Sequence, residues 1–198
     1  MRTLETAPDP TGATAGTSTG LVGLMALQAW VWTASMLPKV TSGAFLGGFA
    51  RFVGTAPPTR NALYGHVVTP IVLAAPSIFA VGALATELAL AATFAVTTVV
   101  LVRRRRSVPR RLLVAGAVAS LVAAGFALNL ALLVGDAAPW RLGDPFDSGV
   151  PVEYLLAGLG LVTAVSAITA LRTAAGRPQR AERRDQAAFM DPFTFPVR

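Results

Sequence analysis

The sequence predicts an all-α integral membrane protein: a bundle of four spanning helices, with an outward amphipathic or re-entrant segment between the first and second spans. Composition is the first reason. Of the 198 residues, 54% are hydrophobic and only 14% are charged, which is too apolar a balance for an ordinary soluble domain of this size. The second reason is that four runs are long enough to cross a hydrocarbon core of about 30 Å, which takes roughly 20 residues of helix.

The four predicted spans cover about residues 21–38, 76–102, 112–134 and 154–171 within a membrane domain of residues 21–172. Trp30, Trp32 and Tyr154 flank or lie in the two shorter runs and suit a membrane interface. Residues 1–20 are rich in Thr, Gly, Ala and Pro, which predicts a disordered segment. Residues 173–198 are polar and basic, so we expect a basic tail outside the membrane.

The arginines predict the orientation of the chain in a cell membrane. Six lie in the stretch RRRRSVPRR at 103–111, and six more lie at 172–198. Loops rich in Lys and Arg stay in the cytoplasm, so both termini are expected there. The net charge of +7 therefore reflects topology and attraction to anionic lipid, and no nucleic-acid partner is expected.

Glu87 is a lone carboxylate within the second predicted span. It lies sixteen residues before Arg103, and Asn129 lies eighteen residues after Arg111. At a rise of 1.5 Å per residue these separations are about 24 and 27 Å, so both side chains are expected in the outer half of the membrane. A buried charge needs a partner, and Lys39 at the outer end of the first span is the expected one. The alternative is a purely structural hydrogen bond among neighbouring helices.

Small residues predict close helix packing. Gly116, Ser120 and Ala124 repeat every four residues on the third span, and Gly158 and Gly160 lie on the fourth. Such spacing lets two helix backbones approach each other.

The segment between the first two spans is expected to cover the Glu87 region. GAFLGGFARFVG at 43–54 has phenylalanines at helical spacing beside Arg51, which predicts a short helix in the interface or on the end of the bundle. The stretch that follows is apolar, contains the single histidine, His66, and is interrupted by Pro70 and Pro76. It predicts a re-entrant or kinked helix.

These motifs, in this order, resemble the DoxX/DoxD-like family of four-helix membrane proteins. The resemblance is carried by LPK at 37–39, GGFARF at 47–52, LYGHVVTPIVLAAPSIFAVGALATELALAATF at 63–94 and ALNLAL at 127–132, and it covers about residues 21–171. It implies a membrane subunit of an oxidoreductase, similar to the small subunit of thiosulfate:quinone oxidoreductase. The polar residues that match by position are Lys39, Glu87 and Asn129.

The sequence also limits the chemistry. Without cysteine the chain cannot run a thiol–disulfide relay, and one histidine cannot supply two axial haem ligands. No metal-ligand spacing or phosphate-binding loop is present, so we expect no haem, metal or flavin to be bound by this chain. A redox role would then use quinone, which dissolves in the bilayer, together with a redox partner subunit.

In this hypothesis Glu87 and His66 are the catalytic residues, which exchange protons with the quinone. Lys39, Asn129 and Arg51 would bind the quinone or an anionic donor such as thiosulfate. Two alternatives stay open: a non-catalytic accessory or assembly subunit of a larger membrane complex, and, less favoured, a small proton-coupled transporter. A homodimer is compatible with each.

Overall fold

The described part of the chain is built of helices alone. The computed structural model describes residues 10–55, 62–104, 109–134 and 152–190, and their side chains within 19–55, 62–104, 109–133 and 152–173. The helices are α1 (Pro10–Thr41), α2 (Ala44–Gly54), the π-helical turn η1 (Tyr64–Val68), α3 (Thr69–Ala74), α4 (Pro76–Arg103), α5 (Arg110–Val134) and α6 (Val152–Met190).

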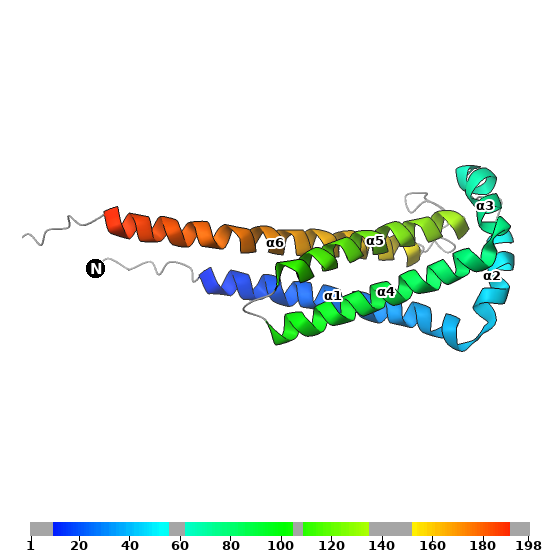
Figure 1. The fold of residues 1–198 in the computed structure, drawn as a ribbon, viewed down its shortest axis with the longest axis horizontal. Coiled ribbons are helices and arrows are strands. Elements are labelled where there is room, and N and C mark those ends of the chain that lie inside the picture. Colours follow the sequence, from blue (N-terminus) through cyan, green and yellow to red (C-terminus); the bar gives the residue numbers. More distant parts are fainter. Residues whose placement is uncertain (1–9, 56–61, 105–108, 135–151, 191–198) are drawn as a thin grey trace, which may run out of the picture.

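Four long helices lie side by side and form the bundle (Figure 1). Each has a segment long and apolar enough to cross a membrane, at Thr19–Thr41, Pro76–Arg103, Arg110–Leu133 and Val152–Thr173. The predicted fold class is confirmed, whereas the boundaries of the spans in a membrane stay predictions. The fold class could be predicted because bilayer thickness sets the length of an apolar run independently of how the helices pack.

Two of the helices are longer than the apolar runs from which their spans were predicted. α1 begins at Pro10, inside the segment for which we expected disorder, and α6 continues through the basic segment to Met190. Hydropathy marks the part of a helix that can lie in hydrocarbon, whereas backbone hydrogen bonding sets where the helix ends. Proline suits the first turn of a helix because its missing N–H has no partner there.

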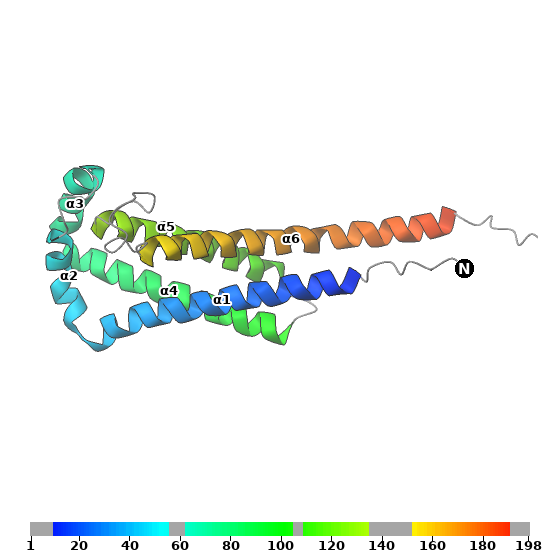
Figure 2. The ribbon, with the colours of Figure 1, turned by 180° about the vertical axis from the view of Figure 1, so that it is seen from behind.

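α2 and α3 lie across one end of the bundle, which we name the capped end; the opposite end is the terminal end (Figures 1 and 2). The start of α1 and the end of α6 both point toward the terminal end, as an even number of spans requires. That the terminal end faces the cytoplasm stays a prediction from the arginine distribution.

The two helices α2 and α3, which we call the cap, have a small apolar core of their own. This confirms the predicted short helix on the end of the bundle. Phe49 and Val53 of α2 are buried with Val72 of α3, Ala80 of α4 and Leu133 of α5. These contacts join the cap to two of the spanning helices.

The expected interruption between the cap and the second span lies at Ala75. Its backbone (φ −144°, ψ 58°) leaves the helical region between α3 and α4. Pro76 explains this, because a proline ring disfavours helical geometry in the residue before it.

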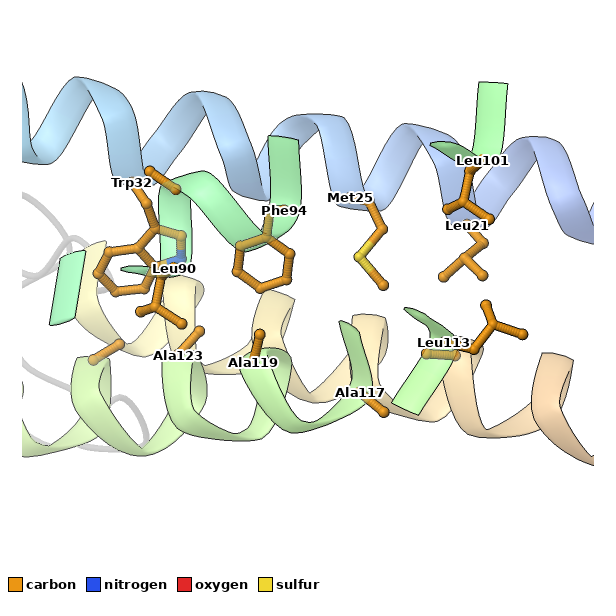
Figure 3. Packing of buried hydrophobic residues seen from close by; sticks show 13 residues of the cluster. Leu21, Met25, Trp32, Leu90, Phe94, Leu101, Leu113, Ala117, Ala119 and Ala123 are labelled. Atoms are coloured by element: carbon orange, nitrogen blue, oxygen red, sulfur yellow. The ribbon is translucent and has the colours of Figure 1, made fainter. Parts of the chain in front are cut away.

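The interior of the bundle is filled by one apolar cluster, shown in Figure 3. Large side chains come mainly from α1 and α4, and alanines come from α5. The outer surface is also apolar: Trp30 is 71% exposed, Ile78 73% and Val165 63%. Such a surface would be a liability in water but is the expected one against lipid tails.

α1 packs chiefly against α4, and α5 against α6. The second contact confirms the predicted close packing of small residues. A Cβ atom on Gly160 would lie 2.8 Å from the backbone oxygen of Ser120 and 2.9 Å from the backbone nitrogen of Ala124. The other predicted packing glycine of α6, Gly158, has nothing within 4 Å of its Cβ position.

Candidate functional site

One face of α1 turns toward the bundle interior and carries both apolar and polar side chains. The residues follow at intervals of three or four, as one helix face requires: Leu21, Met25, Gln28, Trp32, Ser35 and Lys39. The four nearest the terminal end are buried, whereas Ser35 and Lys39 are half-buried. Polarity therefore increases along this face toward the capped end.

Glu87 of α4 meets the polar end of this face. Its side chain is 1% exposed, and its Oε1 atom accepts hydrogen bonds from Lys39 Nζ and from Ser35 Oγ, the latter at 3.3 Å. Lys39 Nζ also donates to Ser35 Oγ at 3.1 Å. The predicted pairing of Glu87 with Lys39 is thus confirmed, and the three residues form a closed triangle that joins α1 to α4.

The cap lies over this triangle. Lys39 Nζ is 5.5 Å from the centre of the Phe45 ring of α2, a distance at which an ammonium is attracted to the ring face. The Phe45 ring in turn packs against Phe49, with centroids 5.5 Å apart. The chain turns back from α1 to α2 at Gly43, whose φ of 63° is a conformation that glycine adopts without strain.

Three buried polar atoms have no hydrogen-bond partner among the described residues: Glu87 Oε2, Gln28 Nε2 and Thr97 Oγ1. Such atoms are rare in folded proteins, and each calls for an explanation such as bound water or a ligand. The two oxygens of Glu87 therefore differ: Oε1 accepts two hydrogen bonds, whereas Oε2 is buried and accepts none from a described residue.

The other predicted site residues do not meet Glu87. Among the described side chains, none of His66, Arg51 and Asn129 forms a hydrogen bond or ion pair with Glu87 or Lys39. His66 and Arg51 are exposed on η1 and α2, which places both at the capped end.

Asn129 is exposed on α5, although its neighbours Ala127 and Ala131 are fully buried. A residue two positions away points to nearly the opposite side of a helix. Counting residues estimates the depth of a side chain in the membrane but says nothing about the face on which it lies. Asn129 and Glu87 are therefore not brought together.

Ser35 belongs to the triangle but is not among the residues predicted from the sequence. Its signal is the spacing of four residues from Lys39, which places the hydroxyl and the ammonium on one helix face. Thr86, the neighbour of Glu87, donates instead to the Gly82 carbonyl oxygen at 2.8 Å and takes no part in the triangle. In the part of the chain that the structure describes, no group of three potential ligands could hold a metal ion.

The four apolar helices define a multi-pass membrane protein, and a partly buried ion pair joins two of them near the capped end. Comparisons with protein-family models, with curated proteins and with solved structures found no match to this chain. The resemblance to the DoxX/DoxD-like family accordingly stays a prediction from its sequence motifs.

Proposed function

We propose that the protein is a membrane subunit of a quinone-linked redox complex, and that Glu87 exchanges protons with the quinone near the capped end. One observation carries the proposal: the carboxylate is buried and held through Oε1 alone, so that Oε2 has no partner among the described residues. When Oε2 carries a proton, it can donate a hydrogen bond to a carbonyl oxygen of a quinone. The apolar tail of a quinone also suits the lipid-facing bundle.

In this proposal the quinone, Glu87 and the Lys39–Ser35 pair have separate roles. A bound quinone would supply the electron acceptor, since two electrons from a partner and two protons convert its carbonyl groups into hydroxyl groups. Protonated at Oε2, Glu87 donates a proton toward a carbonyl oxygen. Lys39 and Ser35 then stabilise the resulting carboxylate at Oε1. Lys39 is 27% exposed and so gives the pair access to protons from the capped end.

The capped end also suits an anionic donor. Arg51 and His66 are exposed at this end and Lys39 is half-buried there, and these groups attract or hydrogen-bond an anion such as thiosulfate. Asn129, on the exposed face of α5, has no part in this arrangement.

A direct test combines turnover with ligand retention. In native membranes, Glu87→Gln should lower quinone reduction by about 100-fold or more, because a positioned proton donor typically contributes that much. Glu153→Gln, at the start of α6, is the matched control and should keep the wild-type rate, because among the described residues Glu153 forms no hydrogen bond or ion pair with the triangle. Native mass spectrometry of the gently extracted protein should show a quinone-sized adduct. Wild-type turnover in Glu87→Gln would remove this residue from the reaction.

The second candidate is a non-catalytic accessory subunit. It is favoured by the completeness of the Lys39, Ser35 and Glu87 triangle, which joins α1 to α4 without any ligand. In that case the extracted protein would carry larger partner chains and no quinone, and Glu87→Gln would reduce assembly of the complex while leaving the turnover per assembled complex unchanged.

A further inference from the structure

The outward side of α5 carries one polar residue in an otherwise apolar line. The line consists of Val118, Val122, Gly125 and Asn129, all of which are exposed and follow one another at intervals of four, three and four residues. At 3.6 residues per turn this spacing keeps them within about 60° of one another around the helix. The fully buried Ala127 lies on the opposite side, so the line faces away from the bundle interior. We call these four residues the α5 outer face.

Asn129 is the unusual member of this face. In the described part of the chain its side-chain amide has no hydrogen-bond partner. The other amide of the described spans, Gln28, accepts a hydrogen bond from Trp32 Nε1 at 2.9 Å, and the exposed Thr33 hydroxyl donates to a carbonyl oxygen one turn back on α1. Asn129 lies inside the apolar segment Arg110–Leu133, where lipid tails offer no partner. An unbonded amide in such surroundings favours contact with a polar group on another helix.

Gly125 lets a second helix come close to the same face. Nothing lies within 4 Å of the position that a Cβ atom on this glycine would take, so its bare backbone is open to the outside of the bundle. A short Asn side chain can reach across an interface only where two backbones lie near each other, and small residues permit that approach. Gly125 is one helical turn from Asn129. The two valines suit the same purpose, because a β-branched side chain has little rotamer freedom to lose.

We propose that the α5 outer face joins this chain to a second copy in the membrane, with Asn129 bonded to Asn129 of the partner subunit. Two copies inserted in the same orientation are related by a two-fold axis along the membrane normal, so each residue near the axis meets its own counterpart. An asparagine suits that position, because its carbonyl oxygen accepts and its NH₂ group donates. The exposed indole of Trp30 can only donate, so it could not pair with its own copy in this way.

This self-complementarity favours a second copy over a different chain. The interface contains no residue of the Lys39, Ser35 and Glu87 triangle, so the inference does not rest on the function proposed for Glu87.

The test measures self-association of the full-length protein in liposomes. Copies labelled with donor and acceptor dyes are mixed, and energy transfer is followed as the protein is diluted with lipid. The wild type should show transfer that saturates at high protein content and is lost on dilution. Asn129→Leu should weaken dimerisation about tenfold, because hydrogen bonding between the two helices is lost. Gly125→Leu should abolish it, because the new side chain would hold the two backbones apart.

Gly158→Leu on α6 is the matched control, since its Cβ position is equally open, and it should dimerise as the wild type does. Unfolding in excess detergent checks that each variant is folded. Neither glycine variant places its Cβ atom against a neighbour within the chain, so both should keep at least the wild-type midpoint. A wild type without transfer above random mixing, or wild-type dimerisation in Gly125→Leu or Asn129→Leu, overturns the proposal.

A second measurement uses native membranes. The chain contains no cysteine, so one introduced thiol reports on one position. Val122→Cys should form a disulfide-linked dimer on mild oxidation, whereas Val165→Cys, at a position 63% exposed on α6, should not. Failure of Val122→Cys to cross-link, or equal cross-linking at Val165→Cys, would refute the interface and leave this face to lipid or to a different chain.

Discussion

Gly160 offers the sharpest test of the packing between α5 and α6. Replacing it with alanine adds one methyl group at the closest approach of the two helices. That methyl carbon would lie 2.8 Å from the Ser120 carbonyl oxygen, 2.9 Å from the Ala124 backbone nitrogen and 3.0 Å from the Ala124 Cβ atom. Two of these three neighbours are backbone atoms, which cannot rotate away as the end of a flexible side chain can.

The expected magnitude follows from two opposing effects. Overpacking of this kind destabilises a core by about 1–3 kcal/mol. Alanine also favours a helix over glycine by up to about 1 kcal/mol. Gly158→Ala isolates the second effect, since nothing lies within 4 Å of its Cβ position on the same helix. Gly160→Ala should therefore be less stable than Gly158→Ala by about 1–3 kcal/mol, which is the packing effect alone.

Thermal or denaturant unfolding of both variants in the same detergent measures this difference. Gly158→Ala should match or exceed the wild-type midpoint, and Gly160→Ala should fall below it. Equal midpoints for the two variants would show that α5 and α6 are not in backbone contact at Gly160, and the packing described above would be wrong.

Three further predictions concern the buried polar groups. Lys39→Met should destabilise the bundle by about 3 kcal/mol in the same unfolding assay, because it leaves a buried carboxylate without its cation. Adding Glu87→Gln should recover most of that loss. If the effects of the two substitutions on stability simply add, Lys39 and Glu87 do not form an ion pair. Trp32→Phe should reduce stability by about 1 kcal/mol through loss of its bond to Gln28, and a variant as stable as wild type would argue against that bond. Thr97→Val should keep or raise stability, because valine has nearly the same shape and removes a buried hydroxyl that has no described partner, and a loss of about 1 kcal/mol or more would indicate a protein partner for the hydroxyl.

The parts of the fold that could be predicted are those that the bilayer itself dictates. Hydrocarbon thickness sets the length of each span, and the high energy of an isolated charge in lipid requires a partner for Glu87. Lys39 was identifiable because it closes the first span at the depth expected for Glu87. Both predictions needed only distances along a helix axis, which residue counting supplies.

The rotation of each helix about its axis was harder to predict. Nearly every position of α5 is apolar or small, so its sequence does not distinguish the lipid-facing side from the interior. Ala127 and Ala131 face inward because small side chains let α5 approach its neighbours, and Asn129 consequently faces outward. A polar residue in a span is thus a weaker indication of a site than a charged one, since exposure on the bundle surface is less costly for an amide than for a carboxylate.

The hydrogen-bond partners of buried hydroxyl groups are the feature that could least be predicted from the sequence. Three hydroxyl residues are buried in spanning helices: Ser120, Thr163 and Thr97. Nothing in the sequence around them distinguishes one from another. Two of them are satisfied by their own helix and one is not, a difference that depends on a single side-chain rotation set by packing. A hydroxyl bonded within its own helix has less capacity to bind another group. Glu87, Gln28 and Thr97 are the residues whose buried polar atoms have no described partner, so these atoms are the ones left to bind water or a ligand.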